Sequence, residues 1–265
     1  MNQSENKATD QPTQSSVNQF ARIEQLMGRE AMSALKAARV AVFGLGAVGS
    51  FTVEGLARSG IGYLRLVDFD RVDASNINRQ LYALNSTVGR EKAELARERV
   101  ADINPACRVE IHASFVNADS LADLLSPDLD MVVDAIDGLN SKVNLIAGAR
   151  SMGLGIVSSM GAAGRTDVSM IRTGDLFETS VCPLARMVRQ RLRRRGIDRD
   201  VPCVYSVEKP LNKQPFREED AVDALEGHGR ARPPIGTVAW VPGCFGLTIA
   251  GRVVRTLTGI TSDAG

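Results

Sequence analysis

Short runs of apolar residues alternate with longer stretches of mixed polarity through most of the chain. The short runs predict strands at residues 39–43, 63–68, 108–112, 131–134 and 156–159. The longer stretches predict helices at residues 48–59, 92–103, 121–125 and 141–152. This alternation favours an α/β chain with a Rossmann-type, mostly parallel sheet that has helices on both faces.

The stretch from Val238 to Gly251 is apolar enough to raise the question of a membrane segment. Arg252 and Arg255 end it early and Pro242 interrupts it, whereas a membrane-spanning helix needs about 20 apolar residues. We therefore expect a buried core helix here and no membrane among the partners of the protein.

The length and composition of the chain predict one large domain. The chain has 265 residues, of which 44% are hydrophobic and 24% charged, so it can bury the core of one large domain. Residues 1–18 are polar, which predicts a disordered tail before a nucleotide-binding domain at 19–265. In the C-terminal extension of this domain, residues 209–236 are polar and hold four prolines, which predicts a mobile loop. Unpaired cysteines and the lack of an apolar export signal predict a cytoplasmic protein.

A glycine-rich loop follows the first predicted strand. Its glycines are Gly44, Gly46 and Gly49, and a predicted helix comes directly after them. In this order the backbone N–H groups at the helix N-terminus point at phosphate. Asp68 ends the next strand about 20 residues further on, where a carboxylate accepts hydrogen bonds from ribose hydroxyls. These residues predict a nucleotide site without specifying the nucleotide.

Charged and amide side chains after this loop favour ATP over NAD. Their positions are Asp70, Asn76, Asn78, Arg79, Gln80, Lys92 and Asp137. A triphosphate that is being cleaved needs fixed cations and a metal, whereas a dinucleotide pyrophosphate is bound largely by backbone N–H groups. Asp137 follows a predicted strand, at the edge where such sheets bind ligands, so it can hold magnesium. Taken singly, Arg79 and Lys92 would be surface charges and Asp137 a helix cap; their joint order favours ATP.

From about Phe20 to Ile171, these motifs resemble the ubiquitin-activating-enzyme-like adenylating superfamily. The resemblance implies that the three glycines and Asp68 hold the nucleotide, with Asp70 and the amides of the cluster beside them. It also implies that Arg79 and Lys92 contact the triphosphate and that Asp137 coordinates magnesium. Arg22 matches an arginine that reaches across a dimer to the neighbouring site, so a homodimer is implied.

The C-terminal half narrows the resemblance. Carrier-protein adenylators of this superfamily hold a zinc ion with two Cys-x-x-Cys pairs, but no cysteine pair of this chain has that spacing, so we expect no zinc. Residues 161–164, 173–176, 183–186 and 204–208 are instead similar to the tRNA threonylcarbamoyladenosine dehydratases. This resemblance implies a tRNA substrate. It leaves open whether a monovalent cation is a further cofactor. It also leaves open whether a cysteine desulfurase or a sulfur-acceptor protein is a further partner.

An arginine-rich stretch supports a polyanionic partner. Residues 183–196 contain no acidic residue, and a helix there would project Arg186, Arg189 and Arg193 outward. The formal net charge of the chain is only +1, so this basicity is local. The plain alternative is a solvated helix face balanced by acids elsewhere, and an acidic carrier protein would be attracted by the same charges.

The resemblance implies a two-step reaction. A carboxylate on a modified tRNA adenosine attacks the α-phosphate of ATP, and an internal nitrogen or oxygen then closes a ring and expels AMP. No protein nucleophile is needed, so we interpret Cys182 and Cys203 as incidental thiols. Two alternatives stay open from the sequence: an enzyme that adenylates a ubiquitin-like sulfur carrier, and an NAD-linked oxidoreductase or nucleotide-sensing module.

Overall fold

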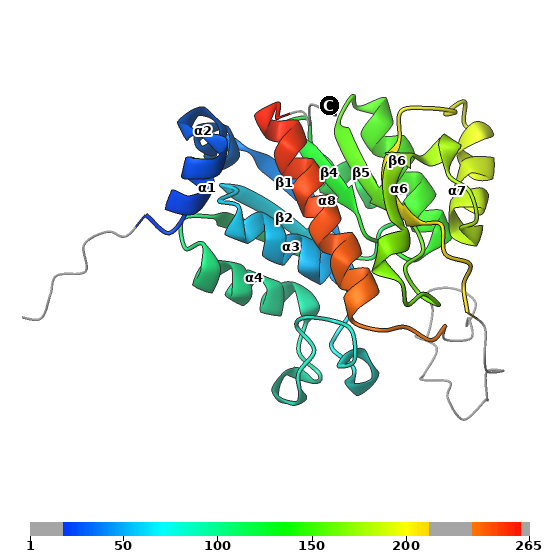
Figure 1. Ribbon diagram of the computed structural model, residues 1–265, viewed down its shortest axis with the longest axis horizontal. Coiled ribbons are helices and arrows are strands. Elements are labelled where there is room, and N and C mark those ends of the chain that lie inside the picture. The colour runs from blue at the N-terminus through cyan, green and yellow to red at the C-terminus, as the bar shows by residue number, and fades with distance from the viewer. Residues whose placement is uncertain (1–17, 212–234, 261–265) are drawn as a thin grey trace, which may run out of the picture.

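The computed structural model describes residues 18–211 and 235–260 (Figure 1). The predicted tail, apart from Asn18, and most of the predicted mobile loop lie outside the described residues. The fold, an α/β arrangement around one sheet, is the predicted one.

One seven-stranded sheet forms the centre of the molecule, in the order β3-β2-β1-β4-β5-β7-β6. Its strands are β1 (Arg39–Phe43), β2 (Tyr63–Val67), β3 (Arg108–His112), β4 (Met131–Asp134), β5 (Gly155–Ser159), β6 (Ile171–Asp175) and β7 (Pro202–Ser206). Every pairing is parallel except that of β6 with β7. The chain order reverses between β1 and β4, and a sheet of this type binds its ligand in the crevice at that point.

Helices cover both faces of the sheet. One face packs against α2 (Arg29–Ala37), α3 (Gly49–Arg58), α4 (Lys92–Ile103) and α8 (Trp240–Thr258). The other face packs against α5 (Leu121–Leu124), α6 (Leu139–Ser151) and α7 (Pro183–Arg193). The remaining helices are α1 (Ala21–Met27) and the 3-10 turns η1 (Ala74–Asn76), η2 (Asn85–Thr87), η3 (Val168–Met170) and η4 (Leu176–Glu178).

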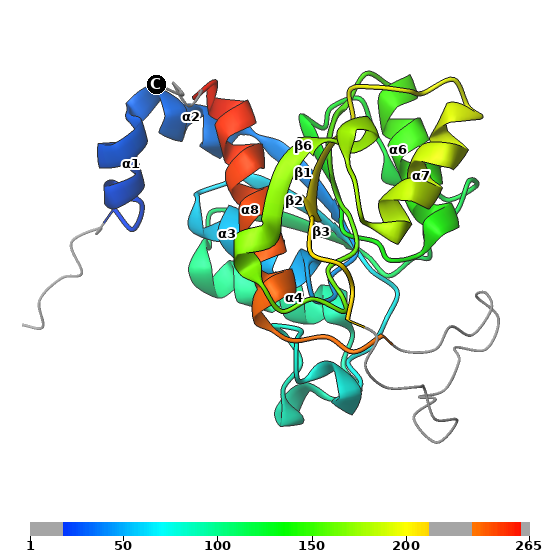
Figure 2. The same ribbon diagram turned by 45° about the vertical axis from the view of Figure 1, so that its right-hand side comes forward.

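The predicted C-terminal core helix is confirmed as α8, which is longer than predicted. Pro242 does not break it, because the proline lies in the first turn, where its missing N–H has no partner to lose. A Cβ on Gly246 would lie 2.4 Å from the carbonyl oxygen of Val48, so the backbones of α8 and α3 touch. Figure 2 shows α8 lying beside α3. Across residues 18–211 and 235–260, no helix is both long and apolar enough to cross a membrane.

Several predicted bounds agree with the structure, including those of β1, β3, β4 and α4. Strands β6 and β7 were not predicted. The residues of β6 are at most half-buried because it is the edge strand, so its sequence lacks an apolar run. Strand β6 joins the sheet through its antiparallel pairing with β7.

Candidate active site

Two glycines of the loop after β1 are required by packing. Gly44 has φ +87°, and a Cβ on it would lie 2.7 Å from the carbonyl oxygen of Ala135, in the loop after β4. A Cβ on Gly49 would lie 1.7 Å from the Gly44 oxygen. At Gly46 the nearest atom to a Cβ would be the side-chain nitrogen of Gln80, at 3.7 Å. Gly46 is thus the glycine of the three with space for a ligand beside it, and Gln80 faces that space.

Asp68 fixes the glycine-rich loop. Its Oδ2 accepts a hydrogen bond from the Leu45 N–H at 2.6 Å, and its Oδ1 accepts from the Asp70 N–H at 2.8 Å. Burial raises the pKa of Asp68, and the nearby charge of Lys92 opposes that rise. A carboxylate has further lone pairs beyond these two bonds, so ribose recognition by Asp68 stays a prediction.

Lys92 begins α4 and is buried rather than a surface charge. Its Nζ lies 2.7 Å from Asp70 Oδ2, so Asp70, predicted to contact the nucleotide, is positioned as the counter-ion of this lysine. The other oxygen of Asp70 is buried without a hydrogen-bond partner among the described residues. An ammonium has three N–H donors, so Lys92 keeps donors for a phosphate.

Arg79 lies half-buried in the loop after β2. Its Nη1 donates to the Ser75 carbonyl at 2.7 Å and to Asn78 Oδ1 at 2.9 Å, which fixes the guanidinium. Burial lowers the pKa of Arg79, and the charge of Asp137 acts in the opposite direction. The loops after β2 and β4 therefore bring the opposite charges of Arg79 and Asp137 near each other.

The two asparagines of the cluster have structural contacts. Asn76 is buried in η1, where its Oδ1 accepts from the Asp73 N–H at 3.3 Å. The Nδ2 of Asn78 donates to the Thr237 carbonyl at 3.2 Å and so joins this cluster to the chain before α8. Direct nucleotide contact by either asparagine stays a prediction.

Asp137 is exposed at the end of β4, just before α6, and no other described residue holds its carboxylate by a hydrogen bond. Within residues 18–211 and 235–260, no group of three His, Cys, Asp or Glu side chains could hold a metal ion. Magnesium fits such a site, because it is commonly bound by one or two carboxylates together with substrate phosphates and water. Asp137 is therefore a suitable protein ligand in the presence of a nucleotide.

A buried ion pair beneath Asp137 was not predicted. Asp134 and Lys142 are both fully buried, with Lys142 Nζ 2.7 Å from Asp134 Oδ2 and 2.8 Å from the Ser159 carbonyl. Asp134 also accepts from the Ser158 hydroxyl and from the Ile136 N–H. The pair thus holds β4, β5 and α6 around the loop that carries Asp137. Lys142 lies beside Val143 and in helical register with Leu139 and Ile146, and a lysine among such apolar positions is a sequence signal for a buried ion pair.

The interpretation of the cysteines as incidental agrees with their surroundings. Cys182 and Cys203 are both buried. Burial raises the pKa of Cys203 to about 12, so its thiolate is scarce near neutral pH. A nucleophilic role is therefore disfavoured for Cys203.

Arg22 lies far from the crevice of its own chain. It is exposed on α1, and the neighbouring Phe20 packs near Gly60, which follows α3. The crevice lies at the opposite end of α3, where Gly49 begins the helix. Any contact of Arg22 with an active site must therefore come from a second chain, which stays a prediction.

The predicted basic face of α7 is wrong for Arg189. This arginine is half-buried and donates to the carbonyls of Thr179 and Leu176. Arg193 is exposed, with its guanidinium carbon 5.5 Å from the ring centre of Phe177, and Arg186 is exposed. Ala185, Val188 and Leu192 face the core, and this orientation of α7 places Arg189 at the edge of the buried face.

Comparisons with known proteins agree with this architecture. The chain matches the ThiF family over residues 19–264. It is 40% identical to the tRNA threonylcarbamoyladenosine dehydratase of Bacillus subtilis, over 91% of this chain and 95% of that protein. The solved structure of Escherichia coli tRNA N6-threonylcarbamoyladenosine dehydratase, TcdA, in complex with ATP is similar, with a TM-score of 0.81 and 33% identity, covering 93% of this chain and 96% of that one.

The molybdopterin-synthase adenylyltransferase of Salmonella typhimurium is 36% identical, but over 52% of this chain and 54% of that protein. The similarity to carrier-protein adenylators therefore covers about half of this chain, and the similarity to the dehydratases covers nearly all of it. The predicted resemblance is confirmed: this chain belongs to the ThiF family.

Proposed function

We propose that the protein is an ATP-dependent dehydratase that adenylates the carboxylate of threonylcarbamoyladenosine in tRNA and closes it into a ring. The observation that carries this proposal is the meeting of Arg79, Lys92 and Asp137 with the glycine-rich loop at the β1–β4 crevice. The near full-length similarity to named dehydratases supports this substrate over a carrier protein.

The proposed reaction has two steps. A carboxylate oxygen attacks the α-phosphorus of ATP, and pyrophosphate leaves with the electron pair of the broken P–O bond. A nitrogen or oxygen of the same modification then attacks the activated carbonyl, loses its proton and expels AMP. The nucleoside has lost one water, whose oxygen leaves on AMP.

The residues of the crevice supply positive charge where negative charge grows. Arg79 is held by Ser75 and Asn78, so its guanidinium needs little rearrangement when pyrophosphate departs. Lys92 is held by the carboxylate of Asp70, which fixes the position of the ammonium. Magnesium bound by Asp137 would neutralise phosphate charge and orient the leaving group.

The proposal is tested by incubating the protein with ATP, magnesium and tRNA that bears threonylcarbamoyladenosine. We expect the modified nucleoside to become lighter by one water and AMP to form in equal amount, measured by mass spectrometry of the digested tRNA. Unmodified tRNA is the control and should give no AMP above background. ATP–pyrophosphate exchange that depends on a carrier with a diglycine tail, and not on tRNA, would instead assign the carrier-protein activity.

We propose that the protein acts as a homodimer in which Arg22 of one chain completes the site of the other. The exposed side chains of Trp240 and Leu247 lie seven residues apart, on one face of α8, and offer an apolar contact surface. The free thiols and the tRNA substrate fit a cytoplasmic location.

The shared site predicts complementation between two inactive variants, Arg22→Ala and Asp137→Ala. Once mixed and re-equilibrated, half of the dimers contain both variants, and one of the two sites in each is intact. Turnover should recover to about a quarter of the wild-type value. Mixing Lys92→Ala with Asp137→Ala is the matched control and should recover nothing, because both residues belong to the same chain's crevice. Lack of recovery in the first mixture would remove Arg22 from the neighbouring site.

A further inference from the structure

Two arginines near the end of α7 reach across to α6. Arg191 donates to Asn140 Oδ1, and Arg195 donates to Asn144 Oδ1 at 2.6 Å. The asparagines are four residues apart on α6, so the two pairs are about 6 Å apart along the helix axis. We call these two pairs the arginine–asparagine row.

The two arginines of the row are held by partners that do not neutralise their positive charge. Both acceptors are neutral amides, and in the described part of the chain no carboxylate forms an ion pair with Arg191 or Arg195. The nearby acids pair elsewhere, Asp200 with Arg150 at 3.6 Å and Asp198 with Arg199 at 3.1 Å. A fixed planar guanidinium that keeps free N–H groups is well suited to phosphate oxygens.

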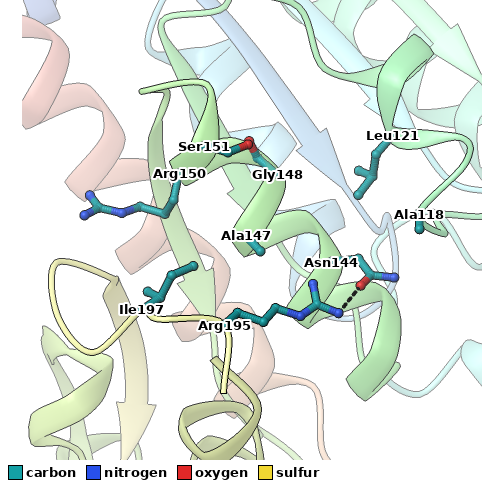
Figure 3. A pocket seen from close by; sticks show the side chains of 9 residues that line it. All are labelled: Ala118, Leu121, Asn144, Ala147, Gly148, Arg150, Ser151, Arg195 and Ile197. Carbon is teal, nitrogen blue, oxygen red and sulfur yellow. Dashed lines mark hydrogen bonds between the residues drawn. The ribbon is translucent and has the colours of Figure 1, made fainter. Parts of the chain in front are cut away.

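The row also leads to the active site. Asn140 is the second residue of α6, and Asp137 lies three residues before it, at the crevice. At its other end the row reaches a hollow of about 630 Å³ on the outer side of α6. Figure 3 shows Arg195 directed at Asn144 on one side of this hollow and Arg150 on the opposite side. Polar and apolar side chains share the lining, among them Ser151, Leu121 and Ile197.

We propose that the arginine–asparagine row is a track for the phosphate backbone of the tRNA, with the hollow taking a nucleotide of the same strand. The inference rests on the proposed tRNA substrate and assigns its path over α6 to the crevice. The volume of the hollow is within the range that holds small organic ligands, and none of the described residues that line it is acidic, so an anionic nucleotide fits. An RNA backbone is favoured over an acidic protein because its charges repeat regularly and match forked donors.

The test measures tRNA binding at several salt concentrations for the wild type and for Arg191→Gln, Arg195→Gln and the double variant. The double variant should bind roughly tenfold more weakly at low salt, and the slope of log K against log salt should fall by about 1.5. Arg97→Gln is the control, an exposed arginine on α4, and should leave both values unchanged. ATP binding should also be unchanged in every variant, which confirms that the fold is intact.

A second pair of variants tests positioning. Asn140→Ala and Asn144→Ala keep both charges but release the guanidinium groups, so affinity should fall while the salt slope stays at the wild-type value. A double arginine variant with wild-type affinity and slope would overturn the proposal. Equal weakening toward poly-glutamate and tRNA would also overturn it, by assigning the row to an acidic protein. If the wild type binds and converts modified tRNA in either case, the proposed function stands while the track does not.

Discussion

Asp137→Ala is expected to lower the rate of AMP formation by at least about 10²-fold, because it removes the carboxylate that we propose holds magnesium against the phosphates. Stability should change little, since Asp137 is exposed and without a hydrogen-bond partner among the described residues. The measurement is AMP release with saturating ATP and modified tRNA, together with the urea midpoint of unfolding.

The variant Asp137→Asn tests whether Asp137 binds the metal, because it keeps the shape of the side chain and removes its charge. We expect this variant to need a higher magnesium concentration for half-maximal rate, because an amide oxygen binds magnesium more weakly than a carboxylate. Asp102→Asn is the matched control, an exposed aspartate near the far end of α4 from Lys92, and should behave as wild type. A wild-type magnesium dependence in Asp137→Asn would exclude Asp137 as the metal ligand.

Lys142→Met is expected to lower the free energy of unfolding by about 3–5 kcal/mol, because it leaves the carboxylate of Asp134 buried without its cation. That loss is a large share of the roughly 5–15 kcal/mol that stabilises a typical domain. Urea unfolding followed by circular dichroism measures it. The exposed Lys36 provides the control, since Lys36→Met should change stability by less than about 0.5 kcal/mol.

The double variant Asp134→Asn, Lys142→Met identifies the cause of that loss. An asparagine at residue 134 carries no charge, its Oδ1 can still accept from the Ile136 N–H, and its Nδ2 can donate to the Ser158 hydroxyl oxygen, so the double variant should be more stable than Lys142→Met alone. If the double variant is instead as unstable as the sum of the single changes, the ion pair does not account for the effect of Lys142→Met.

The glycine-rich loop and the parallel strands around it could be predicted because their parts follow one another in the chain. A strand, a glycine-rich loop and a helix follow one another in the chain, and both Asp68 and Asp137 follow strands whose ends must meet at one edge of a parallel sheet. The edge strand β6 could not be predicted, because a half-exposed strand has no continuous apolar run.

The orientation of α7 could not be predicted from the sequence. Residue types predicted a basic helix, but its rotation was decided by which apolar residues reached the core, and this turned Arg189 inward onto backbone carbonyls. The same rotation placed Arg191 and Arg195 against α6. A contact between residues about 50 positions apart in the chain depends on how two helices pack, and no local pattern encodes it.

The sequence by itself determined the fold class, the glycine-rich loop and the charged residues of the crevice, since each depends on the order of neighbouring residues along the chain. Tertiary structure alone decided which of those side chains are free to act. Lys92 is fixed by Asp70, the Asp137 loop is supported by the buried Asp134–Lys142 pair, and α7 is turned toward α6. The physical reason is that the burial of each charged group is set by packing between segments distant in the chain. Burial in turn sets how strongly that group interacts with other charges.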